Sequence, residues 1–521
     1  MFVPNEQQLA VGDFISHEKG SLNVIARAGT GKTATLVQEV VRRIVEEKLG
    51  ELAIMAFNKA ASEEFKSRIA ELAKETDNAD FSNFKICSAG TVHSFGLNAW
   101  KYVAKYVKVD GNKVRTIING KQDQARLNIY AKGFAPIVQL VSLAKQAAFG
   151  VVSPVDDKSK WFDLADHFDV DFGELSADAV VTAAIDIFNE SVSLDREVID
   201  FDDMILAPLI HNVRMFQKDF VLIDEAQDTN ASRRALALKM LKPTGRLISV
   251  GDDKQSIYGF TGADSNALSL IKAAVNATEL PLSITYRCPK AVVAEANVLV
   301  PDLVAHPSAP EGLVRSLTTI NPKGEHWFIT DAPRATDVVL CRLTAPLIEQ
   351  AYACIVAGVG CRVEGRDIGE GLIQLANRWK SVHTLSQLVT KLDDFQHTET
   401  QKWASRDKAM RAQQIEDRCE TLRLICNQLI VTNKTSIADL TTFIRGLFGD
   451  TPEGEAPKVL TFSTIHKSKG REWNRVYILN RKTTIPTKWA RQKWQLNQEY
   501  NLEYVALTRA KEELVYLNEV K

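Results

Sequence analysis

The chain has 521 residues, of which 45% are hydrophobic and 25% are charged, and its formal net charge is −1. This composition is typical of a globular protein and excludes a disordered or fibrous chain. The length predicts three or four domains. Because the net charge is close to zero, nucleic-acid binding can only come from local basic patches.

The sequence shows neither a recognisable targeting signal nor a paired-cysteine motif. Residues 1–10 contain no basic segment, and the apolar stretch 134–152 is interrupted by Lys145 and Gln146. We therefore expect no signal peptide and no membrane span. The seven cysteines include no CxxC pair. This argues against zinc and iron–sulfur sites and favours free thiols in a reducing compartment, which we expect to be the cytoplasm.

A glycine-containing loop near the N-terminus joins an expected strand, 22–25, to an expected helix, 34–48. Glycines let backbone N–H groups surround phosphate oxygens, and the helix presents the positive end of its dipole. Lys32 would contact the β and γ phosphates of ATP, and Thr33 would bind Mg²⁺. Position 26 is alanine where the usual P-loop pattern has glycine. The residues predicted to contact the nucleotide are Ala28, Gly29, Thr30, Gly31, Lys32, Thr33 and Ala34.

The acidic pair Asp224 and Glu225 follows an apolar run, 220–223, that we expect to be a strand. This pair and the glycine loop look like the two halves of one ATP site. Asp224 comes 192 residues after Lys32, whereas a minimal P-loop domain separates the two halves by well under about a hundred residues. The distance predicts an inserted segment between them.

Alternating strand and helix patterns predict an α/β protein with two cores, each interrupted by a mainly helical insertion. Amphipathic runs at 122–131 and 177–191 indicate helices in the first insertion. In the second insertion, apolar residues recur at helical spacing, which is more typical of a packed helix than of a functional site: Ile415, Cys419, Leu422 and Cys426. The predicted boundaries are 1–100 and 198–280 for the first core, 101–197 for its insertion, 281–370 and 458–521 for the second core, and 371–457 for its insertion.

Further motifs follow in a fixed order. The segment GDDKQSIYGF, 251–260, comes directly after the expected strand 247–250. With the segments already described, it makes the chain resemble the superfamily 1A DNA helicases of the UvrD/PcrA/Rep type over nearly its whole length. The other segments that carry the resemblance are 4–11, 56–61, 91–95, 200–204, 286–287, 464–473 and 504–510.

The resemblance implies two RecA-like P-loop cores that use ATP and Mg²⁺. Gln7, or its neighbour Gln8, would read the adenine. Asp224 would hold Mg²⁺, and Glu225 would orient or deprotonate the attacking water. Arginines from the second core would reach the phosphate only when the cores close. The remaining residues implied at the nucleotide are Gln255 at the γ-phosphate, Tyr286 on the adenine, Arg287 and Arg509 as the arginines, and Gly470 with Glu472 near the ribose or phosphates.

The resemblance also implies a path for single-stranded DNA, which a basic groove and stacking aromatic rings would hold. The implied contacts are Phe57, Asn58, Thr91, His93, Tyr258, Phe260, Thr464 and His466. Three features of this sequence differ from the pattern that is usual in the family. Phe260 stands where tryptophan is frequent, Phe57 directly precedes Asn58 rather than standing two residues before it, and the second insertion is short. The basic segment 481–494, with two tryptophans and no acid, is either a solvated loop or a further DNA contact.

The resemblance therefore predicts an ATP-dependent DNA helicase that moves 3′→5′ along single-stranded DNA. The short second insertion leaves an alternative, a translocase that displaces proteins without intrinsic unwinding. A non-motor nucleotide-binding module is a third class, which the complete set of catalytic residues disfavours. The expected partners are single-stranded DNA, single-strand/duplex junctions, and a single-strand-binding, repair or replication protein. We expect a monomer that does not bind a membrane.

Overall fold

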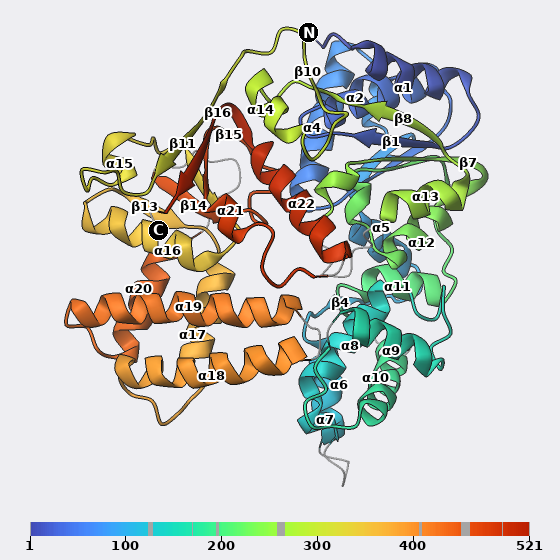
Figure 1. Ribbon diagram of the computed structural model, residues 1–521. Helices are drawn as coiled ribbons and strands as arrows, with labels where there is room; N and C mark the ends of the chain where they lie inside the picture. Colours follow the sequence, from blue (N-terminus) through green and yellow to red (C-terminus); the bar gives the residue numbers. More distant parts are fainter. Residues whose placement is uncertain are drawn as a thin grey trace. The chain divides into compact units, whose positions relative to one another are not determined.

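The computed structural model describes residues 2–122, 129–168, 170–193, 197–257, 266–405, 409–449, 459–491 and 493–519. The chain divides into two compact units, Met1–Ser283 and Ile284–Lys521 (Figure 1). Each unit contains a six-stranded sheet in which all neighbouring strands are parallel, with helices packed against it. The predicted α/β class is confirmed.

The sheet of the first unit has the strand order β3-β2-β6-β7-β1-β8. Every residue of β2 is buried, as expected for a parallel strand covered on both faces. The predicted strands at 22–25, 220–223 and 247–250 each lie within an observed one. The strands are β1 (Leu22–Ala26), β2 (Leu52–Ala56), β3 (Cys87–Thr91), β6 (Lys218–Ile223), β7 (Leu241–Gly251) and β8 (Thr278–Leu282).

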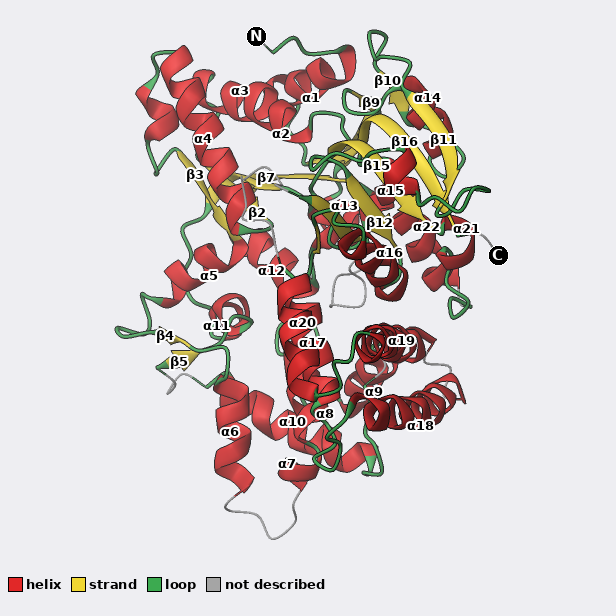
Figure 2. Ribbon diagram, turned by 90° about the vertical axis from the view of Figure 1, so that its left-hand side faces the viewer, coloured by secondary structure: helices red, strands yellow, loops and turns green. Residues whose placement is uncertain are grey.

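Helices cover both faces of this sheet (Figure 2). The first face packs against α1 (Glu6–His17), α2 (Lys32–Thr35), the π-helical η1 (Leu36–Val41), α3 (Arg42–Glu46), α4 (Lys59–Glu75) and the 3₁₀ turn η2 (Ala79–Ser82). The second face packs against α5 (Val92–Trp100), α11 (Asp203–Ile210), α12 (Ala231–Lys239) and α13 (Ala267–Val275), with the 3₁₀ turns η3 (Ala226–Asp228) and η4 (Asp253–Gln255) at strand ends. Alternate residues of β2 face the two cores, because successive side chains of a strand point to opposite faces.

Between α5 and α11 the chain forms a helical subdomain with its own hydrophobic core. The predicted helix 177–191 is confirmed at the same bounds, whereas part of the predicted run 122–131 lies outside the described residues. The elements are α6 (Lys113–Gln122), α7 (Ile129–Lys132), α8 (Phe134–Gln146), α9 (Lys158–His167) and α10 (Ala177–Ser191), with the short strands β4 (Lys108–Val109) and β5 (Val198–Ile199) paired at its base.

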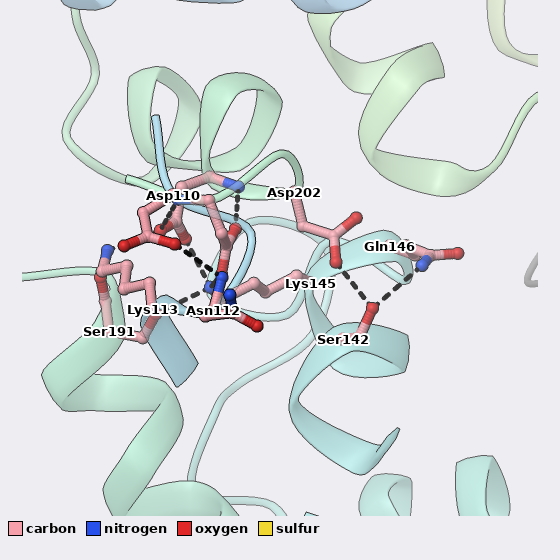
Figure 3. A network of polar contacts seen from close by, with 10 residues as sticks. Asp110, Asn112, Lys113, Ser142, Lys145, Gln146, Ser191 and Asp202 are labelled. Atoms are coloured by element: carbon pink, nitrogen blue, oxygen red, sulfur yellow. Dashed lines mark hydrogen bonds and ion pairs between the residues drawn. The ribbon is translucent and has the colours of Figure 1, made fainter. Parts of the chain in front are cut away.

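A buried ionic network ties this helical subdomain to the segment that leads back to the sheet (Figure 3). Lys145 of α8 is fully buried, and its Nζ lies 2.6 Å from Asp200 Oδ2 and 2.6 Å from Asp203 Oδ1. Lys113 Nζ of α6 lies 2.5 Å from Asp203 Oδ2 and also donates to the Ser191 carbonyl. Although Lys145 interrupts the apolar stretch 134–152 in the sequence, its side chain is therefore not exposed to solvent. It is the cation at the centre of an internal ion-pair network.

The sheet of the second unit has the order β11-β16-β15-β12-β14-β13. Its strands are β11 (Leu313–Thr318), β12 (Val338–Cys341), β13 (Cys361–Val363), β14 (Leu460–Thr464), β15 (Trp473–Leu479) and β16 (Ala510–Asn518), and a separate pair joins β9 (Ile284–Thr285) to β10 (Val304–Ala305). The helices beside the strands are α14 (Lys290–Ala296), α15 (Trp327–Thr330), α16 (Thr344–Val356), α21 (Arg481–Thr484) and α22 (Lys493–Leu507).

Four further helices of this unit are α17 (Arg366–Ala376), α18 (Leu385–Ser405), α19 (Ala409–Val431) and α20 (Ile437–Leu447). Among the described residues, most of their buried apolar side chains belong to the same hydrophobic cluster as the sheet, whereas Trp403 and Ala412 lie outside it. The predicted apolar stripe of α19 is confirmed: Cys419, Leu422 and Cys426 are fully buried in this cluster, and Ile415 packs against it. Helix α17 begins at Arg366, before the predicted insertion boundary.

All seven cysteines are free thiols. Among the described residues, none of the helices combines the length and the hydropathy that crossing a bilayer requires.

Candidate nucleotide and nucleic-acid sites

The glycine loop lies between β1 and α2, at the carboxyl end of a central strand. Gly29 and Gly31 have φ angles of 73° and 77°, which lie in the left-handed region that glycine adopts without steric cost. Gly31 is also the N-cap of α2, so the free N–H groups of the first turn follow it directly. This geometry fits a bound phosphate, as the sequence predicted.

Lys32 and Glu225, 193 residues apart, form an ion pair at the ends of β1 and β6. The Lys32 Nζ atom lies 2.9 Å from both carboxylate oxygens of Glu225. Burial by itself lowers the pKa of Lys32, but the carboxylates of Glu225 and Asp224 outweigh it and raise the pKa overall. The amine is therefore a fixed positive charge. The two halves predicted from sequence meet in one site of the first unit.

Asp224 has the properties of a cation ligand. Its Oδ1 atom is buried and has no hydrogen-bond partner among the described residues. Burial, and then the neighbouring charge of Glu225, raise the pKa of Asp224 to about 7. An unpartnered buried carboxylate oxygen is costly unless a cation neutralises it. Asp224 therefore fits the predicted Mg²⁺ ligand, and the second predicted ligand, Thr33, lies in the first turn of α2, directly after Lys32.

A second polar network at this edge joins the predicted Gln255 to three residues that were not predicted, Arg27, Gln227 and Asp252. Gln255 Nε2 donates to Asp252 Oδ2 at 2.7 Å, and Arg27 Nη1 lies 3.0 Å from Asp252 Oδ1. Gln227 links this network to the catalytic pair, because its Nε2 donates to Glu225 Oε2 at 2.6 Å and its Oε1 accepts from the Asp252 N–H at 3.1 Å. These residues flank predicted ones, but their side chains converge only because β1, β6 and β7 are neighbours in the sheet.

The two candidate adenine-reading glutamines have different surroundings. Gln7 forms two hydrogen bonds with Ser283. Its side-chain oxygen accepts from the Ser283 N–H at 2.8 Å, and its side-chain nitrogen donates to the Ser283 hydroxyl at 2.9 Å. Gln8 is 1% exposed, takes part in the capping box of α1 with Asn5, and donates to the Thr30 carbonyl at 3.3 Å. Gln8 thus contacts the phosphate loop directly, whereas Gln7 contacts the last residue of the first unit.

Five further predicted nucleotide residues lie in the second unit. Arg287 Nε is 2.6 Å from Glu472 Oε2, so these two predicted residues form an ion pair. Tyr286 is 45% exposed and stacks on His306 with 4.7 Å between ring centroids. Arg509 is only 1% exposed, and its guanidinium donates to the carbonyls of Val505 at 2.9 Å and Arg471 at 3.0 Å. Gly470 is exposed, with a φ angle of 82°.

The predicted DNA contacts of the first unit lie at the carboxyl ends of β2 and β3. Asn58 and Thr91 are the N-caps of α4 and α5, so each holds its helix start through its own side chain. Phe57 lies beneath the guanidinium of Arg233, whose Cζ is 5.1 Å from the ring centroid. The Arg233 Nε is buried and has no hydrogen-bond partner among the described residues. Arg233 was not predicted as a site residue from the sequence.

The other predicted DNA contacts divide into two groups. Thr464 ends β14 in the second unit, and His466 follows it in a turn. Tyr258 and Phe260 lie outside the described residues.

The basic segment 481–494 makes contacts within its own unit. Arg481 Nε is 2.5 Å from Glu503 Oε1, and its Cζ is 4.8 Å from the Tyr516 ring centroid. Lys488 Nζ lies 2.6 Å from Glu416 Oε1, and the Trp489 indole donates to Glu416 Oε2 at 2.9 Å. These contacts favour a packed loop over a free DNA-binding surface for this part of the segment.

Both predicted DNA-contact histidines are neutral near pH 7. Burial, with the charge of Arg233, lowers the pKa of His93 to about 4. Burial, with the charges of Arg342 and Lys469, lowers the pKa of His466 to about 3.

We therefore expect His93→Gln, which keeps a neutral polar group, to change single-stranded DNA affinity by the same factor at every pH between about 6 and 8. Fluorescence anisotropy across this range measures the factor, and a factor that grows towards pH 6 would show that the imidazole binds as a cation.

Comparison with known proteins agrees with this geometry. Residues 5–276 match the UvrD/REP helicase N-terminal domain, and residues 460–517 match the UvrD-like helicase C-terminal domain. A Rickettsia conorii protein named "Probable DNA helicase II homolog" is 29% identical over 313 residues, which cover 56% of this chain and 44% of that protein. The ATP-dependent DNA helicase PcrA of Staphylococcus aureus is 24% identical over 348 residues, 62% of this chain and 43% of PcrA.

The chain thus spans less than half the length of these relatives. The N-terminal match alone covers more than half of the chain, and it contains the glycine loop, the acidic pair and the strands that bring them together. The chain belongs to the UvrD/REP helicase family.

Proposed function

We propose that the protein is an ATP-driven DNA helicase that moves along single-stranded DNA in the 3′→5′ direction. One observation carries the ATPase part of this proposal. The Lys32 amine lies 2.9 Å from the Glu225 carboxylate, next to the unpartnered buried oxygen of Asp224. A phosphate-binding cation, a base and a metal ligand at one edge of the sheet are the parts that phosphoryl transfer to water requires.

The ion pair suggests how nucleotide binding prepares the reaction. The γ-phosphate would compete with Glu225 for the Lys32 amine, since both are anions that pair with the same cation. The released carboxylate would then be free to orient or deprotonate the attacking water, while Gln227, which donates to it at 2.6 Å, limits its movement. Asp224 and Thr33 would hold Mg²⁺, which neutralises charge on the phosphates when bound.

Coupling to movement would come from the division into two units. Lys32 and Glu225 belong to the first unit, whereas Arg287 and Arg509 belong to the second. We propose that these arginines assist hydrolysis only when the units close on the nucleotide. An arginine finger of this kind contributes about 10³–10⁵-fold to the rate. Arg509 would have to leave its bonds to the Val505 and Arg471 carbonyls to act in this way.

Two measurements test the function. We expect single-stranded DNA to stimulate ATP hydrolysis, and we expect strand displacement from a duplex with a 3′ tail but not from one with a 5′ tail. A Lys32→Ala variant is the control, because it removes the phosphate-binding cation and should abolish both activities. Stimulated hydrolysis without displacement from either duplex would favour the translocase alternative. Hydrolysis that DNA does not stimulate would contradict both motor proposals.

A further inference from the structure

Three aromatic side chains that no motif accounts for are exposed close to the end of α5. Tyr102, Tyr106 and Phe216 are each 71% exposed. The rings of Tyr102 and Phe216 contact each other edge to face, with 5.6 Å between centroids. Large exposed apolar rings that gather at one place commonly mark an interaction surface. Four exposed cations accompany them in the sequence, and we call all seven residues the aromatic–basic patch: Lys101, Tyr102, Lys105, Tyr106, Lys108, Arg214 and Phe216.

The cations of the patch have no ion-pair partner among the described residues, and the acidic residues that adjoin the patch are Asp110, which follows it in the chain, and Glu197, whose carbonyl accepts from the Lys108 N–H. Neither 101–109 nor 213–218 contains an acidic residue. Lys105 lies 5.9 Å from the Tyr106 ring centroid, which leaves its ammonium group at the edge of an aromatic surface. Unpaired cations interleaved with exposed rings are the combination that proteins use to bind single strands without sequence preference. The patch therefore has the chemistry of a single-strand contact.

A groove lies beside the predicted DNA contact Thr91 and along part of α5, the helix that precedes the patch in the chain. It has a volume of about 700 Å³, and its lining includes Thr91, which is the N-cap of α5, and Ser94 and Asn98 of the helix itself. These residues follow one face of the helix, and Tyr102 comes four residues after Asn98, just beyond the helix end. The nine residues of α5 extend about 13 Å. The other wall includes Lys59, the 68% exposed ring of Phe84, and the ion pair of Lys66 with Glu63 at 2.8 Å.

We propose that the aromatic–basic patch is a second binding site for single-stranded DNA, reached along the α5 groove from the contacts at Thr91. Bases stack on the three rings, and phosphates pair with the lysines and Arg214. This inference rests on the proposed function, because it requires a strand that passes Thr91. An acidic segment of a partner protein is the competing ligand, but the exposed ring faces and the groove that begins at a predicted DNA contact favour the nucleic acid.

The test compares a short oligothymidylate, which reaches only the motor contacts, with a long one that can also reach the patch. We expect the triple variant Tyr102→Ala/Tyr106→Ala/Phe216→Ala to bind the long strand about tenfold more weakly and the short strand as the parental protein does. Replacing the four cations by glutamine should reduce the slope of log affinity against log salt for the long strand by up to about 3. The Tyr102→Phe/Tyr106→Phe variant retains the rings and should bind as the parental protein does.

The controls are Tyr500→Ala, which removes an exposed ring outside the patch, and Lys158→Gln, which removes a cation that is paired with Asp178. Neither should change the length dependence. If the triple variant binds the long strand like the parental protein, or loses affinity for both strands equally, the proposal is wrong. Loss of binding to a glutamate-rich peptide, with DNA binding intact, would assign the patch to a protein partner instead. The parental protein's stimulation by the short strand tests the proposed function separately.

Discussion

Replacing Glu225 by glutamine is expected to lower DNA-stimulated ATP hydrolysis by about 10²–10⁴-fold, the usual contribution of a positioned general base. Glutamine keeps the shape of the side chain but cannot accept a proton from water. The same change removes the negative charge that lies 2.9 Å from the Lys32 amine. If the γ-phosphate competes with Glu225 for that amine, as proposed above, nucleotide affinity should be retained or increased. Steady-state hydrolysis and binding of a fluorescent ATP analogue measure the two effects independently.

The opposite directions of these effects separate the proposed role from simple damage to the fold. A misfolded site would lose hydrolysis and nucleotide binding together. Glu46→Gln is the matched control, because Glu46 forms an exposed pair with Arg42 at 3.1 Å and lies at the far end of the helical run 32–46 that begins at the phosphate loop. It should leave both measurements near the parental values. Parental hydrolysis by the Glu225 variant would show that another group activates the water.

The halves of the nucleotide site could be predicted because each has a local signature. The glycine loop and the acidic pair both follow apolar runs, and parallel strands bring their carboxyl ends to one edge of a sheet. The partners of these residues have no such signature. Arg27 and Gln227 acquire their roles from β7 lying between β1 and β6, which is a property of the strand order. The sequence alone does not determine that order.

For the two helical insertions, too, the sequence predicts the helices but not how they pack. The helical character of 177–191 follows from local periodicity and was predicted at the observed bounds. Whether a group of helices forms its own core depends on long-range packing. The helical subdomain of the first unit does so, whereas α17 to α20 share a hydrophobic cluster with the second sheet. Local patterning is nearly the same in both cases, so it cannot distinguish a separate subdomain from an extension of the core.

The second large effect is expected at Lys145, a charged residue that is fully buried and paired with two carboxylates. We expect Lys145→Met to destabilise the helical subdomain by about 3–5 kcal/mol, because removing one partner of a buried ion pair leaves the other charge uncompensated. Asp200 and Asp203 each lie 2.6 Å from the lost ammonium group. Methionine matches the length of the lysine stem, so the loss would report on charge rather than on a cavity. Hydrogen exchange of the α8 and α10 amides measures the local opening free energy.

A double variant identifies the cause. Asp203→Asn alone should also be destabilising, because it weakens the pairing of Lys145 and Lys113. Combined with Lys145→Met it removes one charge of each sign, so the double loss should be smaller than the sum of the single losses. Lys158→Met is the surface control: its pair with Asp178 is exposed and should contribute no more than about 1 kcal/mol. Additive losses would contradict a coupled network.

If the network is coupled, it holds the helical subdomain rigidly to the acidic segment that leads back to α11. Movements of the first core would then be transmitted to the subdomain through Lys145.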